Sequence, residues 1–366
     1  MALTDIWFLL IAVLWTGYFV LEGFDFGVGA LLGVLGRDEV DRRRMINTIG
    51  PVWDGNEVWL LVAGGATFAA FPQWYASLFS GFYLALLLIL VALIGRGVAF
   101  EYRGKVDDPR WRRRWDAVIM GGSALPALLW GVAFANIVHG VPLDANHEFT
   151  GTLLTLLTPY ALLGGLTTLG VFLLHGAVFV ALRTDGELRD RAVQTALWIA
   201  AVAVPVAAAF LIWTETDHGG GWTLIPAAVA ALALVVAVVT VGQGREGRAF
   251  AATAVAIVAT TVTLFGVLYP NVLPSSTDPA GTLTVLNASS TPYTLRIMTW
   301  VAVAVTPVVL CYQAWTYWVF RGRITRGAIP PAAGLPARSN AAAAEPQPTE
   351  PQPTEPSDPG AAQGTR

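Results

Sequence analysis

The chain has 366 residues, of which 55% are hydrophobic and only 13% are charged, and its mean hydropathy is +0.59. Soluble domains carry about 25% charged residues, so this composition excludes an ordinary soluble enzyme and a disordered protein. The formal net charge of −3 argues against a nucleic-acid partner. The single cysteine, Cys311, allows neither an internal disulfide nor a cysteine-built metal site. We therefore expect an all-α polytopic membrane protein.

A transmembrane helix needs about 20 predominantly apolar residues. Nine stretches meet this requirement and define an expected nine-helix transmembrane domain over residues 1–326. The first stretch is not expected to be a cleavable signal peptide, because it lacks a basic beginning and contains Glu22 and Asp25 in its interior. The nine expected spans are approximately 6–35, 53–71, 76–100, 117–138, 153–182, 192–213, 222–241, 249–269 and 297–320.

Lysine and arginine are confined to alternate connections between these spans. Twenty of the 22 cations follow the first, third, fifth, seventh or last span, and only Arg96 and Arg296 lie elsewhere, near span ends. Cytoplasmic loops of membrane proteins carry an excess of such residues. The N-terminus is therefore expected outside a bacterial plasma membrane and the C-terminus in the cytoplasm. Only one of the cations is lysine, which is typical of a GC-rich bacterial genome.

Two segments outside the spans have distinct compositions. From Gly327 onward the chain is rich in Pro, Ala, Glu and Gln, with a repeat over 345–356. Such a segment cannot bury enough apolar surface to fold, so residues 327–366 are predicted to be a disordered cytoplasmic tail without an assigned function. The outer connection 270–295 is rich in Ser, Thr, Pro and Asn and is expected to form a small ordered cap.

Acidic residues inside the expected spans are the main functional signal. A carboxylate in the bilayer interior is energetically costly and usually marks an ion or proton route. Glu22 and Asp25 are three residues apart and share a helix face. Asp54 and Glu57 repeat this spacing at the start of the second span, and Asp116 begins the fourth. In the expected topology these acids share a depth on the cytoplasmic side, which predicts a proton ladder leading toward the membrane centre.

A structural role is the alternative for the same acids. Asp54 and Asp116 can be first-turn residues, where the helix dipole favours an anion. Glu22 and Asp25 are harder to explain in this way because they lie deep in the first span. No partner arginine is expected for Glu22, since only Arg96 is even nominally inside a span.

Histidine is scarce inside the membrane. Of His139, His147, His175 and His218, only His175 lies clearly within a span. A haem held by two histidines needs both at a compatible depth, so this chain alone is expected to bind neither haem nor metal. His175 is expected to be a packed, hydrogen-bonded side chain. No catalytic motif is present, so catalytic residues are expected on another chain.

Several long motifs resemble subunit II of the cytochrome bd-type quinol oxidases. The first is Glu-Gly-Phe-Asp-Phe-Gly-Val-Gly at 22–29, and the second contains Trp-Asp-Gly-Asn-Glu at 53–57. The resemblance is specific and follows the family's order along the whole chain except the tail. The matching segments are 22–29, 47–60, 64–72, 80–83, 111–116, 131–136, 274–277, 298–303 and 322–325.

This resemblance implies a two-subunit membrane enzyme of the respiratory chain that oxidises quinol and reduces dioxygen to water. The partner, subunit I, carries haems b and d and the quinol-oxidising loop, whereas subunit II is free of haem. The implied fold is two four-helix bundles plus one peripheral helix, which agrees with nine spans. Membrane lipids, a structural quinone and small accessory subunits are further partners found in the family.

The resemblance also implies residues for proton transfer from the cytoplasm toward the haems. The family's acids match Asp25, Asp54 and Asp116, and Trp53 lies beside the route. Glu22 preserves a carboxylate where Asp is familiar and is included in the predicted route. Glu57 stands where Gln is familiar, so no role is carried over to it. Cofactor-binding residues are not assigned.

Two other functions are compatible with intramembrane acids. The chain can be a purely structural subunit that stabilises its partner, with the acids filling polar niches. It can also be a secondary transporter, although such proteins usually show broken helices at matching places in two repeats. The Gly and Pro interruptions of this sequence do not recur in that way.

Overall fold

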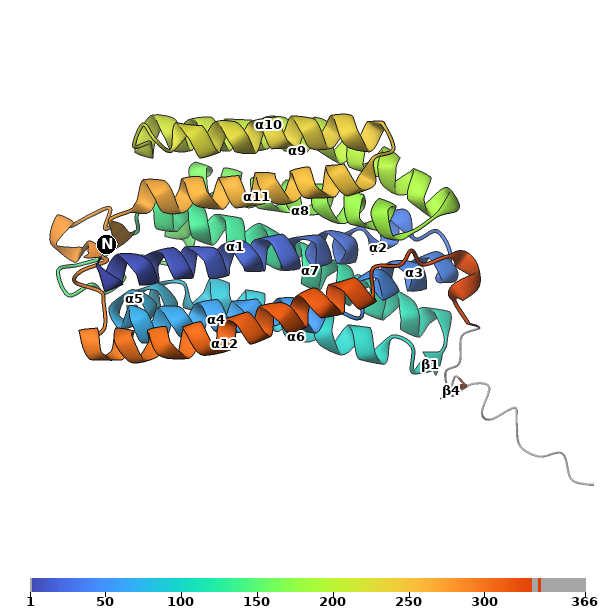
Figure 1. Ribbon diagram of the computed structural model, residues 1–366, viewed down its shortest axis with the longest axis horizontal. Coiled ribbons are helices and arrows are strands. Elements are labelled where there is room, and N and C mark those ends of the chain that lie inside the picture. The colour runs from blue at the N-terminus through green and yellow to red at the C-terminus, as the bar shows by residue number, and fades with distance from the viewer. Residues whose placement is uncertain (1, 331–334, 337–366) are drawn as a thin grey trace, which may run out of the picture.

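A computed structural model describes residues 2–330 and 335–336 (Figure 1). Most of the predicted disordered tail, at 331–334 and 337–366, lies outside the described residues. Long helices run side by side along the molecule, which confirms the all-α prediction. The helices are α1 (Leu3–Ala30), α2 (Leu32–Leu35), α3 (Glu39–Ile49), α4 (Trp53–Ala70), α5 (Pro72–Gly81), α6 (Tyr83–Tyr102), α7 (Pro109–His139), α8 (Pro159–Arg183), α9 (Gly186–His218), α10 (Leu224–Gly242), α11 (Glu246–Leu268) and α12 (Pro292–Val319). Short 3-10 helices are η1 (Leu153–Leu156), η2 (Pro279–Gly281) and η3 (Arg326–Ala328), and short strands are β1 (Val106–Asp107), β2 (Asn271–Leu273), β3 (Leu283–Thr284) and β4 (Leu335–Pro336).

Within the described ranges, eight helices are long and apolar enough to cross a membrane. They are α1, α6, α7, α8, α9, α10, α11 and α12. The 18-residue α4 is not among them; its first turns contain Asp54, Asn56 and Glu57. A polytopic membrane protein is thereby supported.

Two predicted spans are interrupted. The span expected at 76–100 is divided at Phe82, whose φ of −97° and ψ of 13° separate α5 from α6. The span expected at 6–35 breaks at Leu31, so α1 ends at Ala30. Apolar composition continues through both breaks, which is why hydropathy alone predicted single helices. Only α6, of the pair α5 and α6, is long enough to span the membrane.

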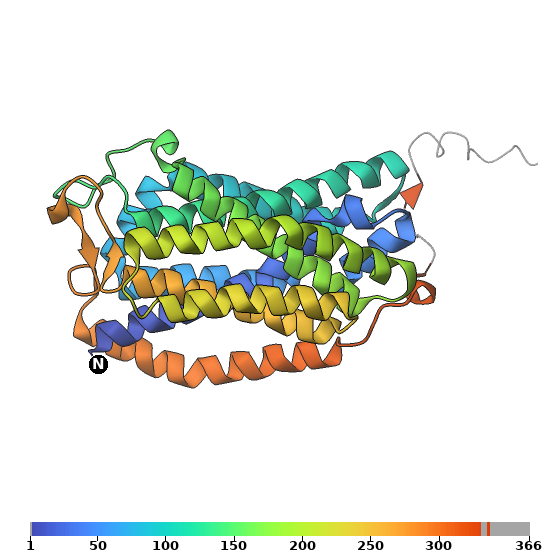
Figure 2. The ribbon, with the colours of Figure 1, turned by 90° about the horizontal axis from the view of Figure 1, so that it is seen from above.

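Helix α1 lies in the middle of the bundle. It packs against α4, α7, α8 and α11, while α9 and α10 lie beyond α8 and α11 (Figure 1). Helix α12 runs along the outside of the bundle as a separate layer, which is clearest in Figure 2. Only Leu295 of α12 is buried. The acid-bearing part of α1 is therefore enclosed by other helices, and α12 is the most exposed of the long apolar helices.

Glycine allows the close packing of α1 on α8. A Cβ atom added to Gly27 would lie 2.8 Å from the Cα of Gly176, so the two backbones touch at this point. Small residues permit such close approach of membrane helices. The neighbouring stretch of α1, residues 22–29, is buried throughout. The packing at Gly27 thus holds the two acids of α1 inside the protein.

The connection 270–295 forms an ordered cap at the end of the molecule that carries the N-terminus. Strands β2 and β3 pair in antiparallel fashion. Val141 forms a bridge to Ser275, which joins this cap to the connection after α7. Val272, Leu273 and Leu283 of these two strands are buried. The expectation of a small ordered cap is confirmed.

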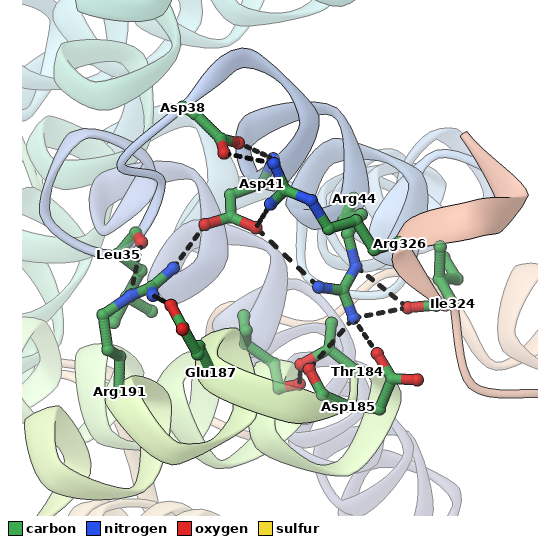
Figure 3. A network of polar contacts seen from close by, with 11 residues as sticks. Leu35, Asp38, Asp41, Arg44, Thr184, Asp185, Glu187, Arg191, Ile324 and Arg326 are labelled. Atoms are coloured by element: carbon green, nitrogen blue, oxygen red, sulfur yellow. Dashed lines mark hydrogen bonds and ion pairs between the residues drawn. The ribbon is translucent and has the colours of Figure 1, made fainter. Parts of the chain in front are cut away.

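At the opposite, arginine-rich end, a set of ion pairs centres on buried Asp41 of α3 (Figure 3). Asp41 is 3.7 Å from Arg44 and 3.3 Å from Arg326, and it also pairs with Arg191 of α9. Arg326 belongs to the chain that follows α12. We call these four residues the Asp41 network. It ties α3, α9 and the segment after α12 together.

Candidate proton-transfer site

The two acids of α1 lie in a fully buried position. Glu22 and Asp25 have no exposed surface, and neither has Arg96 of α6. Arg96 forms an ion pair with Glu22. The expectation that Glu22 lacks an arginine partner is therefore wrong. The pairing arises because α1 and α6 run in the same direction, and each residue lies about two turns before the last residue of its helix.

Arg96 is surrounded by further groups that stabilise its charge. Glu57 of α4 lies 3.9 Å from it, and the guanidinium lies 4.8 Å from the ring centre of Phe26 and 5.6 Å from that of Phe100. Cation–π contacts of this kind are attractive, particularly away from water. Glu57 therefore belongs to the same buried group, although the family resemblance assigned it no role.

A chain of hydrogen bonds connects Asp25 to the exposed helix α12. Asn56 is fully buried, and its Nδ2 donates to Asp25 Oδ2 at 2.7 Å. Asn56 Oδ1 accepts from the Tyr317 hydroxyl at 2.7 Å and from Gln313 Nε2 at 3.3 Å. Gln313 Oε1 in turn accepts from Trp59 Nε1 at 2.8 Å. The buried acid is thus linked through side chains to the outer layer of the protein.

The sequence did not predict these hydrogen bonds between Asp25, Asn56 and α12. Their only signals were the amide of Asn56 between Asp54 and Glu57, and Gln313 and Tyr317 among the polar side chains of the last span. Asn56 and Tyr317 are separated by 261 residues, so their contact depends on tertiary packing.

The buried group retains hydrogen-bonding capacity. Among the described residues, Glu22 Oε2, Asp25 Oδ1, and the Nε and Nη1 atoms of Arg96 have no hydrogen-bond partner. Buried polar atoms in proteins are normally bonded to protein groups or to water. The two carboxylate oxygens can therefore accept a hydrogen bond from water or a proton, whereas the Arg96 nitrogens can only donate hydrogen bonds.

Asp54 and Trp53 lie at the beginning of α4, toward the arginine-rich end. The Asp54 side chain is exposed and its Oδ1 accepts a hydrogen bond from the backbone of Gly55 at 2.8 Å. The Trp53 ring is 5.2 Å from that of Phe100, which in turn contacts Arg96. Glu57 lies one turn further along α4 with a side chain that is 25% exposed. Exposure therefore decreases from Asp54 through Glu57 to Glu22.

Asp116 lies in a different group of charges. Its carboxylate is held by Arg103 at 2.5 Å and by Arg42 at 3.0 Å. Arg103 also donates to both oxygens of Glu39, at 2.8 and 2.9 Å. Within the described ranges, no hydrogen bond or ion pair joins these residues to Glu22 or Arg96. The expectation that Asp116 is a first-turn residue is wrong, because α7 begins at Pro109, about two turns earlier. Its ion pairs with Arg42 and Arg103 support a structural role of a different kind.

His175 is a packed, hydrogen-bonded side chain, as expected. Its Nδ1 lies 2.6 Å from Thr253 Oγ1 and its Nε2 lies 3.2 Å from the carbonyl oxygen of Val20. Its ring stacks on Phe250 with a centroid distance of 4.5 Å. Both ring nitrogens are engaged, so this side chain is not arranged as a ligand. The part of the chain that the structure describes contains no cluster of three or more His, Cys, Asp or Glu residues suited to a metal ion.

Comparison with known proteins gives a consistent result. The family model for cytochrome bd terminal oxidase subunit II matches residues 3–320. Cytochrome bd ubiquinol oxidase subunit 2 of Bacillus subtilis (strain 168) is 42% identical over 329 residues, with 88% of this chain and 97% of the relative covered. Cytochrome bd-I ubiquinol oxidase subunit 2 of Escherichia coli (strain K12) is 40% identical over 363 residues, with 88% and 95% covered.

A solved structure shares the fold. It is a chain of the bd oxidase from Geobacillus thermodenitrificans, with a TM-score of 0.72, 17% sequence identity and coverage of 87% of this chain and 99% of that chain. The family model extends over nearly all of the helical part of this chain, and the identities of 40% and 42% extend over most of its length. The chain therefore belongs to the cytochrome bd terminal oxidase subunit II family.

Proposed function

We propose that this chain is the haem-free subunit II of a cytochrome bd-type quinol:dioxygen oxidoreductase in an aerobic respiratory chain. Its partner, subunit I, carries haems b and d, oxidises quinol and reduces dioxygen to water. The chain supports this partner and supplies protons from the cytoplasm. The observation that carries the proposal is the fully buried group of Glu22, Asp25 and Arg96, in a chain whose relatives are named as oxidase subunits.

The residues of this chain do not fit a haem. His175 is the one histidine in the interior of a membrane helix, and both its nitrogens are engaged. His139 and His218 lie at the ends of α7 and α9. Haem iron needs an available axial ligand such as a histidine nitrogen. Redox chemistry is therefore assigned to the partner subunit, and this chain is left with proton transfer and support.

The proposed proton route begins at exposed Asp54 beside Trp53. It continues through Glu57 to Glu22, whose charge is stabilised by Arg96, and then to Asp25. Carboxylates can accept and release a proton, whereas the Asn56 amide fixes the Asp25 carboxylate in place. The hydroxyl of Tyr317 fixes the other end of Asn56. This order follows the decrease in exposure from Asp54 to Asp25.

Asp116 has a different place in the proposed route from the buried acids. Because Arg42 and Arg103 already bind its carboxylate, we place it at the cytoplasmic mouth of the route. There it joins two arginines in ion pairs and does not belong to the chain of buried acids.

For the fold, we propose nine spans with α4 included. The first four-helix bundle consists of α1, α4, α6 and α7, the second consists of α8, α9, α10 and α11, and α12 is peripheral. The packing of α1 on α4 and α7, and of α8 on α9 and α11, supports this division. The partition of arginines supports an N-terminus outside the plasma membrane and a C-terminus in the cytoplasm.

We propose that subunit I docks on the face formed by α4, α6 and α12. Large apolar side chains are exposed there, among them Leu61, Leu90 and Val308. An apolar groove of about 450 Å³ lies between α4 and α6. This is also the face that the hydrogen-bond chain from Asp25 reaches at α12. Lipids cover the remaining apolar surface. A structural quinone and accessory subunits are expected only from the family resemblance.

The proposal is tested by Asp25→Asn in the two-subunit complex. An asparagine side chain has the same shape and can still accept the hydrogen bond from Asn56, but it cannot carry a proton. We expect normal assembly and haem content with slowed quinol oxidation. The matched control is Glu246→Gln, a buried acid of α11 that pairs with Arg189 outside the route.

The structural alternative gives different results. Wild-type turnover in Asp25→Asn would contradict the proton route and leave this subunit with a supporting role only. Loss of haem together with turnover would mean that the carboxylate stabilises the assembly.

A further inference from the structure

A second charged site lies at the arginine-rich end, beside Asp116 and apart from the buried acids Glu22 and Asp25. It is an open cavity of about 500 Å³ where α3 and α7 begin. Four of its seven lining residues are arginines, and two are acids. The lining residues are Arg37, Asp38, Glu39, Arg42, Pro109, Arg112 and Arg113.

The two acids of the cavity are already paired with cations. Asp38 binds Arg326, at the edge of the Asp41 network (Figure 3). Glu39 receives two hydrogen bonds from Arg103 and lies 3.9 Å from Arg112. Of these cations, Arg326 and Arg103 do not line the cavity, so they balance much of the acids' charge from outside it, whereas Arg112 lines the cavity and also pairs with Asp107. The arginines that line it determine its potential.

The arginines retain unused donors. Arg37 and Arg113 are exposed, and their side chains make no hydrogen bond or ion pair with any described residue. Arg42 uses its Nε and one terminal nitrogen for the carbonyl of Gly36 and for Asp116. A guanidinium has five N–H donors in a planar fork that matches a phosphate. The cavity thus presents several donors with an excess of positive charge.

Aromatic side chains place the cavity at the level of the lipid headgroups. Trp111 stacks edge-on against Trp115 with ring centroids 5.7 Å apart, and Trp115 lies 6.0 Å from Tyr102. Trp111 also donates a hydrogen bond to the backbone of Tyr102 at 2.9 Å. Tryptophan and tyrosine gather at membrane–water interfaces. This cluster shares the first turns of α7 with Arg112 and Arg113, so these arginines lie at interfacial depth.

We propose that this cavity binds the phosphodiester of an anionic membrane lipid. Basic pockets between membrane helices on the cytoplasmic side bind such headgroups. The acyl chains then lie along the apolar outer surfaces of α6 and α7. The bound lipid would join α3 to α7 through one anion, since Arg37 precedes α3, Arg42 lies in its first turn, and Arg112 and Arg113 belong to α7.

The test uses the delipidated two-subunit complex and compares retention of phosphatidylglycerol and phosphatidylcholine by native mass spectrometry. We expect one tightly retained phosphatidylglycerol per complex and none of phosphatidylcholine. Arg37→Gln/Arg113→Gln is expected to weaken this binding about tenfold, because charged hydrogen bonds are lost. The matched control is Arg110→Gln/Arg114→Gln, which removes the same charge from exposed residues that do not line the cavity.

Three results would overturn the proposal. Equal weakening in the control variant would mean general surface attraction. Equal retention of both lipids would mean that the anion is not recognised. Displacement of the lipid by millimolar inorganic phosphate, with the same dependence on Arg37 and Arg113, would assign the cavity to a soluble phosphate instead.

Discussion

Arg96 of α6 and Glu22 of α1 form an ion pair in which neither side chain has any exposed surface. Removing two charges from water costs several kcal/mol per ion, and their attraction compensates for this only with good additional hydrogen bonding. Several polar atoms of this pair have no such bond among the described residues. A buried ion pair of this kind therefore contributes little to the free energy of unfolding. Its presence beside Asp25 is better explained by a need for a controlled charge in the membrane interior.

Removal of Arg96 is expected to be more harmful than removal of Glu22. Arg96→Gln leaves Glu22 and Glu57 without their common cation, and breaking a buried pair costs about 3–5 kcal/mol. Glu22→Gln is milder, because Glu57 lies only 3.9 Å from Arg96 and continues to balance its charge. The double variant should be more stable than Arg96→Gln alone. Thermal unfolding of the complex measures all three, and simple addition of the two single effects would show that the pair is not coupled.

Tyr317→Phe tests the link between Asp25 and α12. The change removes only the hydroxyl that donates to Asn56 Oδ1 at 2.7 Å, while Gln313 keeps its 3.3 Å contact. One hydrogen bond contributes about 0.5–1.5 kcal/mol, which corresponds to roughly a two- to tenfold slower turnover if it positions the route. Haem content should not change. The control is Tyr312→Phe, on the exposed side of the same helix. An equal loss of turnover in this control would show that the Tyr317 hydroxyl has no specific role in positioning the route.

Gly27→Ala is expected to separate α1 from α8. The added methyl group would meet the backbone of Gly176, which cannot rotate away as a side chain could. Overpacking of this kind costs about 1–3 kcal/mol. Gly121→Ala in α7, where nothing lies within 4 Å of the new atom, should leave the melting temperature unchanged or raise it. Equal melting temperatures for the two variants would show that α1 and α8 are not in close contact.

The Asp41 network predicts unequal effects for two neighbouring acids. Asp41 is buried among three arginines, so Asp41→Asn should cost about 3–5 kcal/mol in unfolding experiments. Asp38 is exposed, so Asp38→Asn should lower the free energy of unfolding by only about 0–1 kcal/mol, as is typical of surface ion pairs. A larger loss for Asp38 than for Asp41 would contradict the burial of the network.

The same region has a defined pH dependence. A hydrogen bond from Arg326, with one from the backbone of Asp41, holds the pKa of Asp38 below its usual value. The contribution of Asp38 is therefore complete above the unfolded pKa of about 3.9 and is lost as the pH falls through the lower folded value. Between about pH 5 and 8 the stability difference between wild type and Asp38→Asn should be constant. A slope in that difference over this range would contradict the assignment.

The lengths of the apolar stretches in the sequence predicted most of the long helices. A bilayer requires about 20 apolar residues per helix, so composition locates α7 to α12 with modest errors at their ends. The packed state of His175 was predicted because a lone intramembrane histidine is more often buried than liganded. The breaks at Leu31 and Phe82 were not predicted, since apolar residues continue through them and backbone angles are not visible in hydropathy.

The candidate site could be predicted only in part. Glu22 and Asp25 were identified because charge is costly inside a span. The same argument applied to Arg96, yet its partner depends on which helices become neighbours, and that information lies in tertiary packing. Asn56 and Tyr317 were missed for the same reason. The placement of acids along the sequence also identified Asp54, Glu57 and Asp116, and the family resemblance supplied Trp53. Neither indicated that Glu57 faces Arg96.

The central claim is that buried acids of this chain deliver protons to haems held by another subunit. The most direct test is a density map of the intact two-subunit complex at a resolution that shows water. We expect ordered water and side chains to join Asp54, Glu22 and Asp25, and to continue toward the haem subunit across the face of α4 and α12. A map in which tightly packed apolar side chains isolate Asp25 and Glu22 from both the cytoplasm and the haems would contradict it.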